Sequence, residues 1–309
     1  AIAQNLQDNN QGDVFLINIH SGGYAVPNGS QPDFRTQWGQ AIANQSGLAG
    51  YPAGTINRQN FPGQEQGNSG TTALGRGQWA GASNTVLGQA SYANTAVTAV
   101  VDVQTRIMTI DVEAYYTDNS PLAVNKLNVA VLQNNTLGPQ VGGNMGNNYV
   151  HQHRLIDLLT GQWGIDISNT TAGSFYSNEF TYAIPDDING IPVKIQDLEV
   201  VVFIAETTQY IVSGNGALPS YTGISSNDVN LKSVSQINPT CLGSVSPTIS
   251  IENLGANEAT TLDITYSVNE GPSQVYNWTG NLSTFQEEEV ALPAIAFTQQ
   301  ETNTLNISV

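Results

Sequence analysis

Residues 107–115 alternate between apolar and polar side chains, and a period of two restricts this segment to a β-strand with one buried and one solvated face. The apolar members of this run are Met108, Ile110, Val112 and Ala114. Three further runs have the apolar and β-branched composition of strands, and they cover residues 127–132, 180–184 and 198–205. We therefore predict an antiparallel β-sandwich over residues 91–212.

A second all-strand unit is predicted over residues 248–309, where several runs alternate in the same way. In one of these runs the side chains expected to face inward are Leu262, Ile264, Tyr266 and Val268. The charge changes before this unit, because no Lys or Arg follows Lys232. Residues 213–247 are rich in Gly, Ser, Asn and Pro, so we predict a linker between the two sandwiches.

Residues 1–90 combine helix and strand signals. The spacing of apolar residues predicts helices over 1–12 and 32–47, each ending at a glycine. Residues 14–19, with the sequence VFLINI, form the continuous apolar run of a strand that is covered on both faces, and a second strand is expected near Tyr51. This order predicts a partial α/β domain. The fold class is therefore α+β multidomain and mostly β, with two antiparallel β-sandwiches after the α/β domain.

Charged residues make up only 11% of the chain, and the formal net charge is −17. Nucleic-acid phosphates and anionic lipid surfaces repel such a chain, so we exclude both as partners. No apolar run approaches the roughly 20 residues of a membrane-spanning helix. A surface rich in Asn, Gln and Thr but poor in Lys indicates an extracellular protein, and the start at Ala1, without Met or a leader, predicts a processed segment of a longer precursor.

Cys241 is the only cysteine, so no internal disulfide can form and stability must come from packed cores. It lies in the predicted linker. Two interpretations remain open for this residue: an inert thiol, or a thiol whose partner belongs to a part of the protein outside this segment.

The three histidines limit any acid–base or metal chemistry. His151 and His153 lie two residues apart, so on a strand their imidazoles would share a face and could chelate one divalent ion. No third ligand is evident, and we predict hydrogen bonds to backbone or carboxylate groups and no metal site. His20 ends the first predicted strand without an adjacent nucleophile. Because nucleophile, zinc-protease and phosphate-loop motifs are also absent, we predict a protein with no enzymatic activity and no cofactor.

The order of SGG after the first predicted strand, then GYPAGTINR, then YVHQHRLIDLLTGQWG resembles the outer-membrane protein family of about twenty-eight kilodaltons from Gram-negative bacteria that use type nine secretion. The resemblance covers roughly residues 1–212. The later stretches IENLGANEATTLDITYSVNEG and VYNWTGNLS resemble the cell-adhesion-related immunoglobulin-like domain of bacterial surface proteins. The resemblance therefore implies a truncated thioredoxin-like domain over 1–90, a β-sandwich, and an Ig-like sandwich over 248–309.

The thioredoxin-like part of the resemblance implies that Pro52 is the cis-proline of that fold, preceded by Tyr51. The redox chemistry does not carry over, because it needs a Cys-x-x-Cys pair at a helix start and this chain has only Cys241. The family implies an extracellular or outer-membrane location on a Gram-negative cell and export by type nine secretion.

Our leading hypothesis is a non-enzymatic secreted or cell-surface protein with a binding, adhesion or scaffolding role, whose partner is a protein or a glycan. Exposed aromatic residues are the usual anchors of such binding. The candidate binding residues in the two sandwiches are Trp163, Tyr149, Trp278 and Tyr276. One alternative is a structural subunit of a fibre, sheath or surface layer, which would form homo-oligomers or filaments. The other is a thiol-disulfide protein whose Cys-x-x-Cys lies upstream of this segment.

Overall fold

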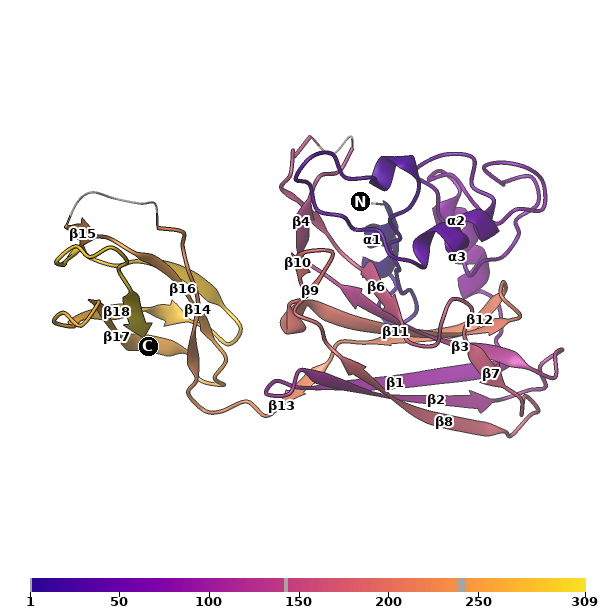
Figure 1. Cartoon of the computed structure of the whole chain (residues 1–309). Helices are drawn as coiled ribbons and strands as arrows, with labels where there is room; N and C mark the ends of the chain where they lie inside the picture. Colours follow the sequence, from indigo (N-terminus) through magenta and orange to yellow (C-terminus); the bar gives the residue numbers. More distant parts are fainter. Residues whose placement is uncertain (1, 142–143, 238–242) are drawn as a thin grey trace. The chain divides into compact units, whose positions relative to one another are not determined.

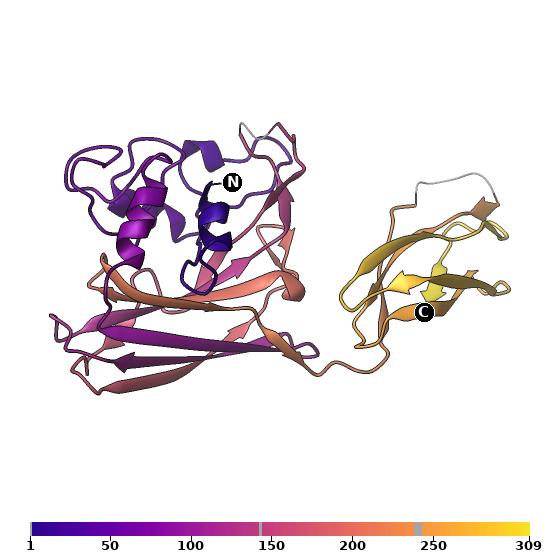
Figure 2. The ribbon, with the colours of Figure 1, turned by 180° about the vertical axis from the view of Figure 1, so that it is seen from behind.

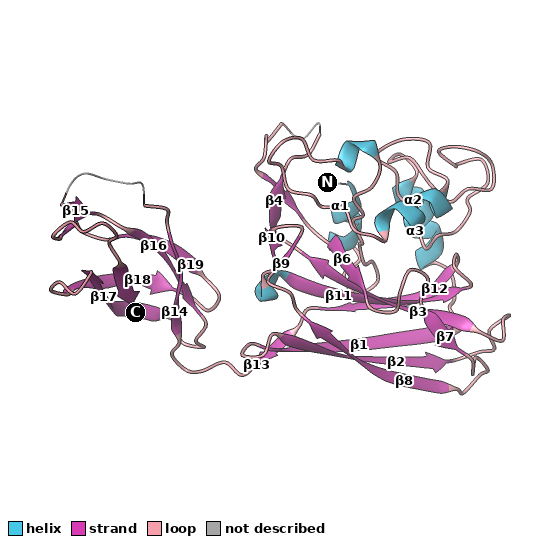
Figure 3. Ribbon diagram, viewed as in Figure 1, coloured by secondary structure: helices cyan, strands magenta, loops and turns pink. Residues whose placement is uncertain are grey.

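The structure is a computed structural model that describes residues 2–141, 144–237 and 243–309. Cys241 therefore lies outside the described residues. The chain divides into two compact units, Ala1–Thr222 and Gly223–Val309. Strands dominate both units, as Figure 3 shows, so the predicted mostly β multidomain class is confirmed. Among the described residues, no helix has the length and apolarity that a bilayer crossing requires.

The first unit is built on two sheets that face each other (Figures 1 and 2). The first sheet has the strand order β13 (Ser220–Thr222), β1 (Ala93–Asp102), β2 (Ile107–Tyr116) and β8 (Phe175–Ala183). The second has the order β12 (Ile211–Ala217), β11 (Leu198–Glu206), β3 (Asn125–Gln133) and β6 (Arg154–Leu158), and β7 (Ile165–Ile167) also pairs with β3. All these pairs are antiparallel except β13 with β1. The predicted sandwich is present.

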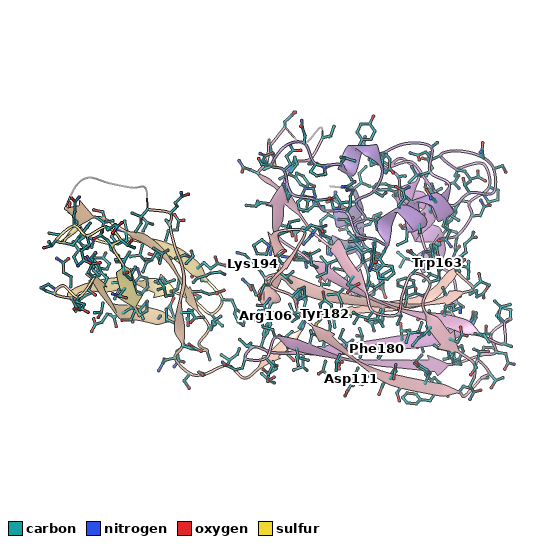
Figure 4. All side chains as sticks on the ribbon, viewed as in Figure 1. Arg106, Asp111, Trp163, Phe180, Tyr182 and Lys194 are labelled. Atoms are coloured by element: carbon teal, nitrogen blue, oxygen red, sulfur yellow. The ribbon has the colours of Figure 1, made fainter. Side chains whose placement is uncertain are left out.

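The alternation predicted for 107–115 is realised in β2, where every second residue is buried. Met108, Ile110, Val112 and Ala114 are at most 1% exposed, so they fill the space between the two sheets. The intervening side chains of β2 face away from the second sheet, and Asp111 is one of them (Figure 4). In contrast, β3 and β11 are buried along almost their whole length because both of their faces are covered.

The N-terminal segment covers the other face of the second sheet. Its helical elements are α1 (Ile2–Asp8), η1 (Gly23–Ala25), α2 (Gly39–Ser46) and α3 (Trp79–Leu87). Its apolar side chains, among them Phe15, Ile17 and Trp38, pack against Ala130 and Leu132 of β3 and their buried neighbours. Figures 1 and 2 show these helices on this side of the sandwich only. The first sheet therefore has an outer face that none of the described helices of this unit covers.

Residues 14–19 do not form the predicted strand. Within residues 2–90 the only β pairings are isolated bridges, and the run contributes one of them, Asn18 with Arg154. The backbone N–H of Asn18 donates to the carbonyl of His153 at 2.8 Å, and Asn18 accepts from Leu155 at 2.9 Å. The apolar run gains its burial by lying on the second sheet, so it needs no neighbouring strands of its own.

Two further boundaries differ from the predictions. The second helix begins at Gly39 rather than near residue 32, although it ends at Gly47 as expected, where the backbone is left-handed with φ 66°. The range 213–247, predicted as a linker, contains most of β12, all of β13, and strands of the second unit. Glycines and small polar residues hide the strand pattern there, because their side chains give no apolar alternation to detect.

The first unit also contains two short β-hairpins. They are β4 (Thr136–Gly138) with β5 (Tyr149–His151), and β9 (Asp187–Ile188) with β10 (Ile191–Pro192), which is followed by η2 (Ile195–Asp197). The β4–β5 hairpin carries two of the predicted site residues, Tyr149 and His151.

The second unit, Gly223–Val309, contains two three-stranded sheets and one short pair. One sheet is β14 (Val229–Val234), β16 (Thr248–Asn253) and β19 (Glu287–Ala291), and the other is β18 (Gln274–Leu282), β17 (Ala259–Val268) and β21 (Leu305–Ser308). The short pair is β15 (Ser244–Val245) with β20 (Ile295–Ala296). Ile264, Tyr266 and Val268 lie in the hydrophobic core of the second unit, and Leu262 packs against that core, as the alternation predicted.

Candidate functional site

Aromatic and imidazole rings gather where the N-terminal segment meets the β4–β5 hairpin. His20 Nε2 lies 3.3 Å from His151 Nδ1. The ring of Phe34, from the loop before α2, lies 5.1 Å from that of His20 and 4.7 Å from that of His151. Tyr149 contacts His151 edge-on at 4.9 Å. The fold thus brings together two histidines that are 131 positions apart in the sequence.

Arg154 of β6 is buried beside this cluster and is only 1% exposed. Its Nη2 donates to Gln133 Oε1 at 2.7 Å, and its Cζ lies 5.4 Å from the centre of the Phe34 ring. None of the carboxylates that the structure describes forms an ion pair with this guanidinium. Burial lowers the pKa of Arg154 to about 10.

The imidazoles of this cluster are held in their neutral forms. The pKa of His20 falls to about 4, chiefly because the ring is buried and further because of His151 and the Arg154 charge. Burial also lowers the pKa of His151, and Arg154 acts in the same direction. At neutral pH neither ring carries a charge, so the pair joins two segments of the fold through a single hydrogen bond.

His153 does not share a face with His151, so the geometry expected for a chelating pair is absent. The strand is interrupted between β5 and β6, and His153 has a left-handed backbone with φ 53°. Its Nδ1 lies 2.7 Å from Glu199 Oε2, while His151 Nε2 lies 3.2 Å from the carbonyl oxygen of Pro139. The described residues contain no group of three His, Cys, Asp or Glu side chains that could hold a metal ion.

An open depression of about 470 Å³ lies beside His20 and is lined by Ser21, Gly22, Asp33 and Arg35, among others. Its charged groups are already paired, because Arg35 Nη2 lies 2.7 Å from Asp33 Oδ2. The Ser21 hydroxyl lies 3.3 Å from the Tyr51 hydroxyl, and no described histidine or carboxylate hydrogen-bonds to it to activate it as a nucleophile. The peptide bond between Tyr51 and Pro52 is cis, the isomer that the thioredoxin resemblance implied.

The four predicted binding aromatics occupy different environments. Trp163 is half-buried, with the Arg58 Cζ 5.7 Å from its ring centre (Figure 4). Tyr149 is also half-buried, against His151. Trp278, however, is only 3% exposed and lies in the core of the second unit, and Tyr276 packs against the same core. Trp278 is therefore not the exposed aromatic that the binding prediction assumed. Tyr276 is half-buried, like Trp163 and Tyr149, and its binding role stays a prediction.

The first sheet carries a pair of exposed aromatic residues that was not predicted from the sequence. Tyr115 of β2 and Phe175 of β8 are 47% and 57% exposed, and they stand directly opposite each other across the two strands. Two residues before Tyr115 in β2, the alternation places Glu113 on the same side. We name this surface the outer face, defined by Thr98, Asp111, Glu113, Tyr115, Phe175 and Glu179. The period of two placed Tyr115 outward, but only the strand register reveals its pairing with Phe175.

The comparisons with known proteins place the chain in a family. The model of the family described as "Outer membrane protein Omp28" matches residues 39–213, which is more than half of the chain. No curated protein matches the chain in sequence.

Several solved structures are similar to this chain at low sequence identity. The structure of HBP35 of Porphyromonas gingivalis is 13% identical, with a TM-score of 0.45, over 82% of this chain and 79% of that chain. A domain of the outer membrane lipoprotein Omp28 from Porphyromonas gingivalis is 14% identical, with a TM-score of 0.32, over 42% of this chain and 98% of that chain. The family match shows that the chain belongs to the Omp28 family of outer-membrane proteins, and it places the chain at the surface of the Gram-negative outer membrane.

Proposed function

We propose that this chain is a non-enzymatic surface protein that binds a protein or glycan partner on the outer face of its first sheet. The observation that carries the proposal is the pair Tyr115 and Phe175, two large side chains that are half exposed and directly opposite each other. Aromatic side chains at such positions are the usual anchors of binding, since they bury a large area at a small cost in conformational entropy.

The contrast between the two sheets supports this choice of surface. The N-terminal segment covers the second sheet with Phe15, Ile17 and Trp38, whereas none of the described helices covers the first sheet (Figures 1 and 2). A sheet with one solvated face normally carries polar residues on it. Tyr115 and Phe175 depart from that pattern without contributing to a core, and an exposed apolar cluster of this kind indicates an interaction surface.

The histidine cluster supports a role without catalysis. His20 and His151 are neutral and bond to each other, and His153 is bonded to Glu199. Among the described residues, none of the three rings contacts a Ser, Thr or Cys that it could activate as a nucleophile. The cluster therefore serves to fix the β4–β5 hairpin and the N-terminal segment on the sandwich.

The full chain can be tested for binding on two kinds of array. One carries bacterial surface glycans, and the other carries purified outer-membrane and host matrix proteins. We expect at least one ligand whose signal falls by about tenfold in the double variant Tyr115→Ala/Phe175→Ala. The control is Tyr24→Ala/Leu218→Ala, which removes side chains that are 76% and 73% exposed elsewhere on the same unit. The proposal is wrong if both double variants bind every ligand like the wild type.

The edge strand β18 favours a second candidate, a subunit of an extracellular assembly. β18 has nine residues and carries no charged side chain, and among the strands that the structure describes it pairs only with β17. Edge strands without charge or proline are open to pairing with another chain. Sedimentation of the full chain over a range of concentrations separates the candidates, because assembly through β18 predicts concentration-dependent oligomers that a Val275→Lys substitution abolishes. A monomer at all concentrations counts against assembly.

A further inference from the structure

The outer face carries three carboxylates beside its aromatic pair. Asp111 of β2 stands directly opposite Glu179 of β8 in the antiparallel register. Glu113 follows two residues along β2, on the same side of the sheet, and the next outward position is Tyr115. All three acidic side chains are exposed.

These carboxylates have no compensating partner. In the part of the chain that the structure describes, Asp111, Glu113 and Glu179 form no side-chain hydrogen bond and no ion pair. Cations are scarce, because the chain has eight Lys and Arg, and the described ion pairs of Lys and Arg lie elsewhere. The outer face therefore carries uncompensated negative charge next to its two exposed aromatic rings.

The opposition of Asp111 and Glu179 is unfavourable for the isolated sheet. Like charges at directly opposed positions of an antiparallel pair destabilise the sheet. Asn, Gln, Ser and Thr, which this chain uses freely on its surface, would occupy the same positions without repulsion. The opposed pair Asp111 and Glu179 is thus unfavourable in the isolated sheet, and the approach of positive charge relieves this repulsion.

We infer that the partner bound on the outer face is a polypeptide segment that presents Lys or Arg side chains to Asp111, Glu113 and Glu179. This inference rests on the proposed function, and it names the class of partner. Charge complementarity selects this occupant. A second copy of this chain is a poor fit, because its net charge is also −17.

The spacing of the groups suits an extended segment. Successive outward positions along a strand are about 7 Å apart and directly opposed side chains about 5 Å apart, so basic residues at alternate positions of an added peptide can each reach a carboxylate. Tyr115 and Phe175 lie at one end of the acidic group, where they can accept an apolar side chain or the face of an arginine guanidinium.

Selection of displayed random peptides on the immobilised full chain tests the inference. Peptides are selected in parallel on the wild type, on Asp111→Asn/Glu113→Gln/Glu179→Gln, and on the control Glu258→Gln/Glu270→Gln/Glu301→Gln. The control removes the same charge from three exposed positions of the second unit. The leading wild-type peptide is then synthesised, and its affinity for each chain is measured near physiological salt.

We expect peptides selected on the wild type to be enriched in Lys and Arg. The leading peptide should bind the first triple variant about tenfold more weakly and the control triple variant less than about twofold more weakly. Equal losses in the two triple variants would show attraction by net charge alone and would overturn the inference. An absence of Lys and Arg enrichment would overturn it as well.

The double variant Tyr115→Ala/Phe175→Ala distinguishes failure of the inference from failure of the proposed function. If the leading peptide loses affinity for this double variant but not for the Asp111, Glu113 and Glu179 triple variant, the face binds a partner of another chemistry and the inference alone is wrong. If neither variant affects binding, both are wrong. Denaturation curves verify that each variant folds, and the acid-to-amide triple variant should be at least as stable as the wild type.

Discussion

His20 and His151 bond to each other, Nε2 to Nδ1, at 3.3 Å, and this contact ties the segment before α2 to the β4–β5 hairpin. The contact requires at least one ring to be neutral. Burial of the pair, with the nearby Arg154 charge, lowers the pKa of both rings. The junction is consequently a part of the first unit that should respond to acid.

The first prediction concerns this acid response. Because the pKa of folded His20 is about 4 and that of an unfolded histidine is near 6.5, the unfolded chain binds more protons between these values. His20 therefore contributes stability above pH 6.5, and the contribution is lost as the pH falls through 4. We expect the loss to reach about 3 kcal/mol.

Urea unfolding at pH 7 and at pH near 4 measures this effect. His20→Gln removes the titrating ring, so its stability should fall less over the same pH interval than that of the wild type. The second unit serves as an internal reference because it has no histidine. Parallel pH profiles for the wild type and His20→Gln would contradict the prediction.

The second prediction concerns Asp111 and Glu179, which repel each other across β2 and β8. Asp111→Asn should raise the free energy of unfolding of the first unit by about 0.2–1 kcal/mol, because it removes a directly opposed like charge. Glu258→Gln, at an exposed position of the second unit, is the matched control and should leave the first unit unchanged. A loss of stability in Asp111→Asn would show that this carboxylate supports the fold.

A third prediction concerns Glu199, which accepts hydrogen bonds in a buried site. Its Oε2 lies 2.7 Å from His153 Nδ1 and 3.1 Å from Asn134 Nδ2. Glu199→Ala leaves both partners unsatisfied and should cost about 1–3 kcal/mol. In the double variant Glu199→Ala/His153→Ala the loss should be smaller than the sum of the single losses, as coupling between the two side chains requires. Additive losses in the cycle would exclude that coupling.

A fourth prediction is that Trp278 contributes to the stability of the second unit and not to the binding of a partner. This side chain is 3% exposed in the second core, and its Nε1 donates to Glu288 Oε1 at 3.1 Å. Trp278→Ala should destabilise the second unit by about 3–5 kcal/mol. Trp278→Phe keeps most of the packing, loses the hydrogen bond, and should cost about 1 kcal/mol without changing the affinity for a partner. A weaker affinity for the partner in a Trp278→Phe protein that stays folded would contradict this prediction and would show that Trp278 takes part in binding.

Much of the fold could be predicted from the sequence because alternation is a local signal. Each outward position of β2 was readable from the period of two, and the inward residues Met108 and Ile110 are fully buried as expected. The same reasoning wrongly predicted a strand over residues 14–19, because this run is apolar without being part of a sheet. Continuous burial has two physical origins, a central strand or an extended segment lying on a sheet, and the sequence pattern does not distinguish them.

The site could not be predicted in the same way because its contacts are distant in sequence. His20 meets His151, and Tyr115 meets Phe175, only after the strands have taken their register. The shared face considered for His151 and His153 assumed a continuous strand, whereas the left-handed backbone of His153 ends it. Trp278 was chosen by residue type alone, and its inward orientation follows from the pairing of β18 with β17.

Footprinting by hydroxyl radicals tests the binding face most directly, on the full chain with and without a saturating amount of the selected basic peptide. We expect Tyr115 and Phe175 to become protected while Tyr24, exposed elsewhere on the same unit, stays equally reactive. Unchanged labelling of Tyr115 and Phe175 together with protection at other residues would contradict the assignment of the outer face as the binding surface.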